Sequence, residues 1–182
     1  SSLTNLVIPP KVTNIGENAF TDCSSLTSLE IPKSVTSIGG NAFFGCENLT
    51  NMTIPDSVSN LETYGLFCEC TNLRSVRLPE SIDKIRDYAF KDCAALENIV
   101  FGNNATSKGI VIPKGVTSIG ALAFWNCAKI TSVTIPKGVT SIETYTFNQC
   151  YMLKSLTLPN SITNIGENAF WMCYSLKDIY YN

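Results

Sequence analysis

Apolar and polar residues alternate over short stretches that recur along the whole chain. In residues 26–31, the apolar Leu29 and Ile31 are separated from each other, and from Leu26, by polar residues. Because successive side chains of a strand point to opposite faces, this alternation predicts a short strand with one buried face. Pro32 follows directly and lacks an N–H group, so it marks the end of the strand ladder.

The rest of this unit predicts the path by which the chain returns. Val35 and Ile38 predict a second short extended piece on the far side of a coil. The Asn-Ala-Phe stretch at 41–43 predicts one helical or 3₁₀ turn before Cys46. One such coil cannot bury its own apolar side, so several coils have to stack.

Three residue types share one period, which is about 23 residues. The strand-ending prolines are spaced by 23, 23, 24, 34, 23 and 23 residues: Pro9, Pro32, Pro55, Pro79, Pro113, Pro136 and Pro159. A phenylalanine recurs with the same period: Phe20, Phe43, Phe67, Phe90, Phe124, Phe147 and Phe170. So does a cysteine: Cys23, Cys46, Cys70, Cys93, Cys127, Cys150 and Cys173. This periodicity predicts that residues 1–182 form a single solenoid of about eight stacked 23-residue coils, mainly β with short helical or 3₁₀ turns and one parallel sheet on one face.

Two insertions interrupt the period. One extra residue lies between Val58 and Phe67, and we expect it to form a small bulge around Glu62–Gly65. About eleven residues are added near 102–112, a polar, turn-rich stretch that predicts a loop at one edge of the stack. Such an insertion can decorate a binding face or be tolerated without a function.

The composition argues against several classes of function. The net charge of −2 disfavours nucleic-acid binding, and no run of 18 apolar residues predicts a membrane span. The chain contains no histidine, which removes the commonest general base and metal ligand. Without a Cys-x-x-Cys pair, a phosphate-binding glycine loop or converging carboxylates, we expect no enzyme, no cofactor and no metal.

Seven of the eight cysteines occupy the same slot of the repeat. Adjacent coils are close enough for disulfides, but a column of seven small apolar thiols is explained by packing alone, so we expect buried free thiols. Cys68 differs because it lies two residues before Cys70, in a slot expected to face outward. We therefore predict that Cys68 is the accessible thiol, and without a nearby base we do not interpret it as a nucleophile.

The repeated motif Leu-x-x-Ile/Leu-x-Ile-Pro-x-x-Val-x-x-Ile-Gly-x-x-Ala-Phe-x-x-Cys-x-x-Leu resembles the BspA-type leucine-rich repeat. Residues 26–46 and 153–173 match it most closely, and the resemblance covers essentially the whole chain. It implies a leucine-rich-repeat solenoid from a cell-surface or secreted protein of a host-associated bacterium, with adhesion to host extracellular-matrix protein as its function. We expect the chain to be a fragment of a longer protein. Because the motif consists of core residues, it identifies no ligand.

Candidate binding residues come from the outward slots. The slot after the column phenylalanine holds Phe44, Trp125 and Trp171, and Tyr151 and Tyr174 lie on the same edge. Trp and Tyr are enriched at binding hot spots, so this aromatic edge is predicted to contact a partner. Ordinary packing between adjacent turns is the alternative.

A second candidate is the pair Arg74 and Arg77 on the outer face of the sheet, which is the only local concentration of charge. Taken together, the sequence favours a non-catalytic surface module that binds a matrix protein or another macromolecule. Two alternatives stay open: a structural spacer that displays another domain, and a glycan-binding module.

Overall fold

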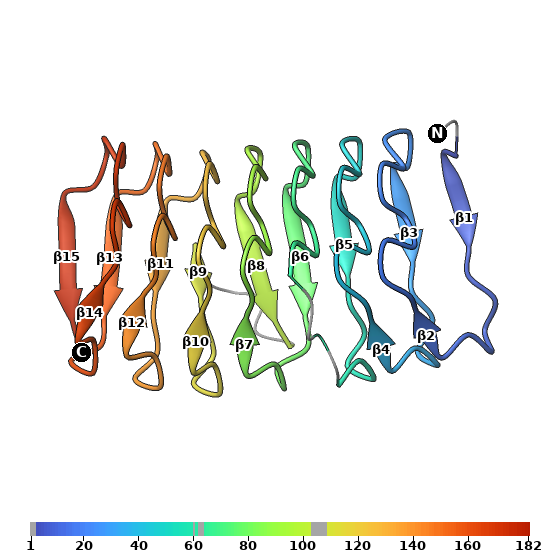
Figure 1. Ribbon diagram of the computed structural model, residues 1–182, viewed down its shortest axis with the longest axis horizontal. Coiled ribbons are helices and arrows are strands. Elements are labelled where there is room, and N and C mark those ends of the chain that lie inside the picture. Colours follow the sequence, from blue (N-terminus) through green and yellow to red (C-terminus); the bar gives the residue numbers. More distant parts are fainter. Residues whose placement is uncertain (1–2, 60, 62–63, 103–108) are drawn as a thin grey trace.

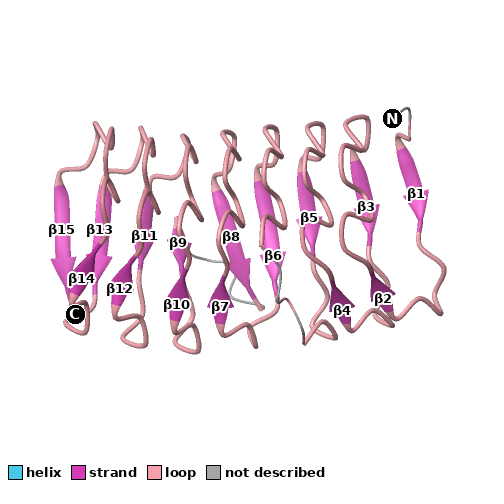
Figure 2. Ribbon diagram, viewed as in Figure 1, coloured by secondary structure: helices cyan, strands magenta, loops and turns pink. Residues whose placement is uncertain are grey.

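The chain forms an elongated solenoid of parallel coils stacked along one axis (Figure 1). The structure is a computed structural model that describes residues 3–59, 61, 64–102 and 109–182. These residues form strands and turns but no helix (Figure 2). The described part of the chain contains no apolar helix of membrane-spanning length.

One side of the solenoid, here called the strand face, carries nine of the described strands. In stacking order they are β1 (Asn5–Val7), β3 (Ser28–Glu30), β5 (Asn51–Thr53), β6 (Ser75–Leu78), β8 (Asn98–Phe101), β9 (Ile110–Val111), β11 (Ser132–Thr134), β13 (Ser155–Leu158) and β15 (Asp178–Tyr181). The second side carries β2 (Asn14–Ile15), β4 (Ser37–Ile38), β7 (Lys84–Ile85), β10 (Ser118–Ile119), β12 (Ser141–Ile142) and β14 (Asn164–Ile165). All pairings are parallel, which confirms the predicted fold.

The register places equivalent residues of successive repeats side by side. Met52 pairs with Val76, and Val133 pairs with Leu156, so each apolar position forms a column that is buried in the inner coils. The strand face is not one unbroken sheet: its hydrogen-bonded segments are β1-β3, β5-β6-β8 and β9-β11-β13-β15.

The phenylalanine column runs through the core from Phe20 to Phe170. Neighbouring rings stack with centroids 5.3–5.7 Å apart and interplanar angles of 17° or less. Each ring belongs to one turn, so the described chain makes seven turns, and β15 begins a further one. The sequence-based estimate of about eight coils is close to this number.

The predicted helical or 3₁₀ turns are instead tight β-turns. In the first coil, Asn18 and Asp22 both have φ of 56°, in the left-handed region. This geometry directs the Asn18 and Asp22 N–H groups to the next coil, where they donate to the carbonyls of Gly40 (2.9 Å) and Phe44 (2.8 Å). A helix would use these N–H groups within its own turn, whereas the solenoid uses them to join coils.

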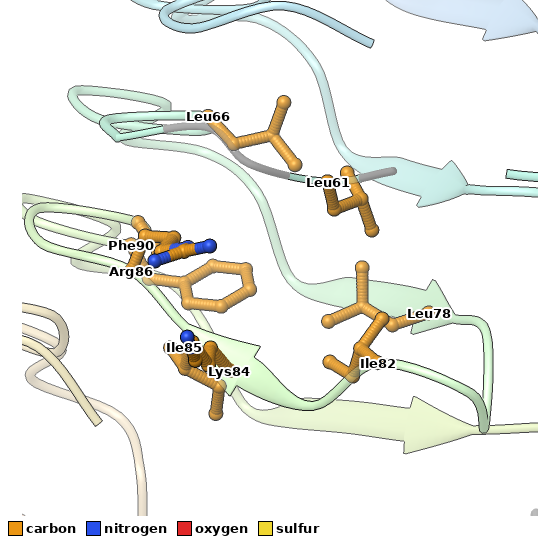
Figure 3. Close-up of a pocket in the computed structure, with 9 residues that line it drawn as sticks. Leu61, Leu66, Leu78, Ile82, Lys84, Ile85, Arg86 and Phe90 are labelled. Carbon is orange, nitrogen blue, oxygen red and sulfur yellow. The ribbon is translucent and has the colours of Figure 1, made fainter. Parts of the chain in front are cut away.

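A small, mostly apolar cavity lies next to the one-residue insertion. Leu66 stands in the position that Ala42 and Ala89 hold in neighbouring repeats. Beside Leu66 is a cavity of about 30 Å³, lined by Leu61, Leu66, Leu78, Ile82, Lys84, Ile85, Arg86, Ala89 and Phe90 (Figure 3). It has room for about one water molecule. Of the predicted bulge, Glu62 and Thr63 lie outside the described residues.

The long insertion contributes an additional strand. The sequence places residues 102–112 in a loop, but within this stretch Ile110–Val111 form β9, and Ile110 pairs with Val133 of β11. On the second side, Lys84 of β7 pairs directly with Ser118 of β10. The strand face therefore gains a layer that the second side lacks. Residues 103–108 lie outside the described part of the chain.

Candidate partner-binding surfaces

The cysteine column consists of free thiols, as the sequence predicts; its five inner members are buried, and Cys23 and Cys173 at the two ends are half-buried. From the second coil onward, each thiol donates to the phenylalanine carbonyl of the preceding coil; Cys70 Sγ, for example, lies 3.1 Å from the Phe43 oxygen. Burial raises the thiol pKa, to about 12 for Cys46 and about 11 for Cys173. Thiols with a pKa this high stay protonated at neutral pH, so Cys46 and Cys173 contribute packing and weak hydrogen bonds but no nucleophile.

The prediction that Cys68 is accessible is wrong. Only 5% of Cys68 is exposed, and burial raises its pKa to about 11, although the positive charge of Lys91 opposes the shift. The neighbouring members of its column are Phe44 and Lys91, both long side chains on adjacent coils. A side chain that points outward from its own coil is therefore buried when the side chains at the same position of both adjacent coils are large.

Trp125 is half-buried and held by a polar network. Lys91 Nζ lies 4.8 Å from the centroid of the Trp125 ring. The same Nζ forms an ion pair with Asp92 at 2.8 Å, and Asn126 Nδ2 donates to Asp92 Oδ1 at 2.8 Å. Lys91 therefore occupies one face of the indole, leaving less of Trp125 available to a partner than the sequence predicts.

Between Trp125 and Trp171 in the same column is Asn148, which is fully buried. Its Nδ2 donates to the Asn168 carbonyl at 3.3 Å, whereas Oδ1 has no hydrogen-bond partner among the described residues. Trp171 belongs to the last complete turn and is 53% exposed. The two tryptophans thus differ: Trp125 packs within the stack, and Trp171 is open to solvent.

The tyrosines form a second aromatic contact on the same edge. Tyr151 and Tyr174 stack with centroids 5.9 Å apart at an interplanar angle of 19°. Tyr151 donates from its hydroxyl to Gln149 Oε1 at 2.8 Å, while Tyr174 is 72% exposed. Met152 is also exposed. We name Trp171, Tyr151, Met152 and Tyr174 the aromatic edge.

Phe44 is not part of the aromatic edge. It is half-buried and belongs to the second coil, three coils away from the coil of Trp125. The shared slot thus brings the tryptophans into one column with Phe44 but leaves Phe44 remote from the exposed rings.

The two arginines differ in their surroundings: Arg77 is ion-paired, whereas Arg74 is exposed to solvent. Arg77 Nη2 contacts both carboxylate oxygens of Asp56, at 3.0 and 2.8 Å, whereas Arg74 is exposed. The Arg77–Asp56 pair lines a groove of about 930 Å³ over β3 and β5, together with Glu30 and Lys33. β3 and β5 belong to separate hydrogen-bonded segments. The mixed charges of this groove leave no net positive patch.

Sequence reasoning missed one groove, which lies beside Lys114 and Lys137. A repeated Pro-Lys-Gly-Val sequence, at 113–116 and 136–139, is the feature of the sequence that could have indicated this groove. Across the described residues, no cluster of three or more Cys, Asp or Glu side chains could hold a metal ion.

Comparison with known proteins gives one family. A model of the BspA type leucine-rich repeat region, in six copies, matches residues 1–109 and 100–182. This match covers the whole chain and confirms the resemblance seen in the repeated motif. No curated protein sequence matches the chain.

Solved bacterial structures share the fold. A leucine-rich repeat protein from Eubacterium ventriosum aligns with a TM-score of 0.75 at 26% identity, over 93% of this chain and 42% of that one. A leucine-rich cell surface protein from Faecalibacterium prausnitzii aligns with a TM-score of 0.63 at 30% identity, over 97% and 60%. The leucine-rich repeat protein of T. pallidum aligns with a TM-score of 0.60 at 26% identity, over 95% and 78%. The chain thus spans about half the length of the first two.

Proposed function

The chain belongs to the family of BspA-type leucine-rich repeat proteins, and on this premise we propose that it is a non-catalytic module that binds a macromolecule at the cell surface or outside the cell. The similarity to a leucine-rich cell surface protein of Faecalibacterium prausnitzii supports this location. Stacked repeats present extended surfaces that suit a large partner better than a small substrate.

The observation that carries the proposal is the aromatic edge. Trp171 and Tyr174 expose more than half of their surface, although large apolar side chains are costly to leave in water. Rigid aromatic side chains provide much contact area at a low cost in conformational entropy, which is why they dominate binding hot spots.

The partner that we propose is a protein of the host extracellular matrix, so that the module acts in adhesion. A glycan is the alternative, because the flat face of Trp171 can stack on a sugar ring. The two partners differ in what they require: a glycan depends on the ring faces, whereas a protein also uses the surrounding apolar area of Met152 and Tyr151.

The experiment compares aromatic variants on immobilised matrix proteins and on a glycan array. We expect Trp171→Ala and Tyr174→Ala to weaken binding by at least about tenfold, since hot-spot truncations cost 2 kcal/mol or more. The matched control is Tyr88→Ala, which removes an exposed aromatic from a turn of another coil. Unchanged binding by folded Trp171→Ala and Tyr174→Ala proteins would refute the aromatic edge.

A spacer function has some support of its own. Thr36, Thr117 and Thr163 each donate from the hydroxyl to the backbone carbonyl of the preceding coil, so these side chains reinforce the stack. A spacer needs such rigidity and no exposed hot spot. It predicts that the folded chain binds neither matrix proteins nor glycans in the same experiment.

A further inference from the structure

A groove of about 530 Å³ lies where β9 and β11 end, at the turns of two successive coils. Its floor is apolar and includes Val111, Ile112, Ile135 and Pro136. Two lysines, Lys114 and Lys137, border this floor at equivalent positions of the two coils. We name it the lysine groove.

The charge of the lysine groove opposes that of the whole chain, which has a net charge of −2. Lys114 and Lys137 are both exposed, and the ion pairs of the described residues, Arg77–Asp56 and Lys91–Asp92, involve neither. The equivalent positions of the adjacent coils hold the acidic Glu80 on one side and the neutral Asn160 on the other. Lys33 holds this position in the second coil, beside Glu30 and Asp56, so Lys114 and Lys137 are the two lysines of this slot that lie on neighbouring coils.

A glycine follows the lysine in both turns. Gly115 and Gly138 follow Lys114 and Lys137, whereas the first coil has Lys11 at this position and the second, third, fourth and seventh coils have serine. A Cβ at Gly138 would lie 2.9 Å from the Val116 carbonyl oxygen, so the backbone here approaches the previous coil more closely than a side chain permits. At Gly115 the nearest such atom, the Ile82 carbonyl oxygen, is 3.8 Å away, so the close approach is specific to Gly138.

The groove also depends on the additional strand. Val111 belongs to β9, points outward and is 44% exposed, while its neighbour Ile110 is buried. Without β9, this part of the floor would be absent. The insertion and the two Lys-Gly turns therefore combine in one surface feature.

We propose that the lysine groove binds an extended peptide segment of a partner protein that carries an aspartate or glutamate next to an apolar residue. Lysines on adjacent coils of a parallel stack are about 5 Å apart, so their ammonium groups can bracket one carboxylate. The apolar side chain of the peptide then covers Val111 and Pro136. A nucleic acid would need a broader basic surface, and an anionic glycan would leave the apolar floor unused.

The lysine groove is independent of the aromatic edge. In Figure 1 the strands of the strand face run from the edge that carries the aromatic turns to the opposite edge, where the Pro-Lys turns follow the strand ends. A partner held at one edge does not require the other, so the two proposals can fail separately.

The test uses two fluorescein-labelled peptides, one of alternating leucine and glutamate and one of leucine and glutamine, with fluorescence anisotropy as the readout. We expect the glutamate peptide to bind at least about tenfold more tightly at low salt, and this preference to shrink as salt screens the charges. Lys114→Ala/Lys137→Ala should lower its affinity about fivefold to tenfold. Lys129→Ala/Lys177→Ala, which removes two exposed lysines elsewhere, is the matched control.

Two results would overturn the proposal: equal binding of the two peptides, or an equal loss in both double variants. A heparin oligosaccharide that binds the groove more tightly than the glutamate peptide would assign the lysines to an anionic glycan instead. Thermal unfolding of all variants verifies that each is folded. Trp171→Ala should leave peptide binding unchanged, which separates this site from the aromatic edge.

Discussion

The thiol of Cys93 donates a hydrogen bond to the backbone carbonyl of Phe67 in the preceding coil, with 3.0 Å between sulfur and oxygen. This contact joins the phenylalanine column to the cysteine column in the core. Cys93 is fully buried, so Cys93→Ala should leave a small void and an unpaired lone pair on the carbonyl. We expect a loss of about 1–2 kcal/mol in the free energy of unfolding, measured by urea denaturation.

Cys23 is the matched control for this change, because it occupies the first coil and is only half-buried. Cys23→Ala should cost about 0.5 kcal/mol. Equal losses at the two positions would contradict the idea that the sulfur contact between coils matters.

The raised thiol pKa values predict sensitivity to alkali. A group whose pKa is higher in the folded state than in the unfolded state stabilises the fold below the unfolded value and loses this contribution as pH rises through the folded value. Burial raises the pKa of Cys68 from 9.0 to about 11 and that of Cys46 from 9.0 to about 12. The free energy of unfolding should therefore fall steadily above pH 9.

Urea denaturation at a series of pH values between 8 and 11 measures this slope. Cys68→Ala removes one ionising thiol and should make the decline shallower over the same range. A decline of the same steepness in wild type and Cys68→Ala would show that other groups cause it.

Glu69 has φ of 62°, in the left-handed region, at the position that Gly45 holds with φ of 66° one coil earlier. Glutamate is sterically strained in this backbone conformation, whereas asparagine tolerates it better. Glu69→Asn should therefore stabilise the protein by about 0.5–1 kcal/mol, seen as a higher Tm. Glu97→Asn, an exposed site without a positive φ, should leave Tm unchanged or lower it; an equal rise there would point to charge instead of backbone conformation.

Strand β9 makes the insertion part of the core. Ile110 is 1% exposed, so Ile110→Ala should lower the free energy of unfolding by about 3 kcal/mol. Val111→Ala, in the same strand but facing solvent, should change it by less than about 0.5 kcal/mol. If residues 102–112 were a surface loop throughout, the two substitutions would have similarly small effects.

The period of the sequence was enough to predict the columns of the core. A phenylalanine or cysteine that recurs once per coil has similar surroundings in every inner coil, so its burial there follows from repetition alone, whereas Phe20, Cys23, Phe170 and Cys173 at the ends are only partly buried. The outward slots could not be predicted in this way. Whether Cys68 or Trp125 is exposed depends on the sizes of its two stacked neighbours, which differ from coil to coil, whereas Trp171 belongs to the last complete turn and has a neighbour in this slot on one side only.

The turn conformation and β9 show two other limits. Asn18 and Asn41 are residue types that tolerate a positive φ, but Tyr88 and Leu122 adopt the same conformation without any such signal. For β9 the signal was present, because Ile110-x-Ile112-Pro113 repeats the pattern Leu29-x-Ile31-Pro32. The polar, turn-rich residues before Ile110 favour a loop instead, which is why the sequence predicts a loop over all of residues 102–112.

The extra layer at β9 also affects how the solenoid can bend. β8 and β9 are neighbours but belong to separate hydrogen-bonded segments, whereas on the second side β7 pairs with β10 and the rings of Phe90 and Phe124 stack at 5.5 Å. Flexing that opens the strand face at this seam breaks no strand pairing, while flexing in the opposite sense strains both the β7–β10 pairing and the ring stack. The solenoid should therefore resist bending less on the strand face of this seam than on the second side, and the lysine groove lies next to that less constrained side.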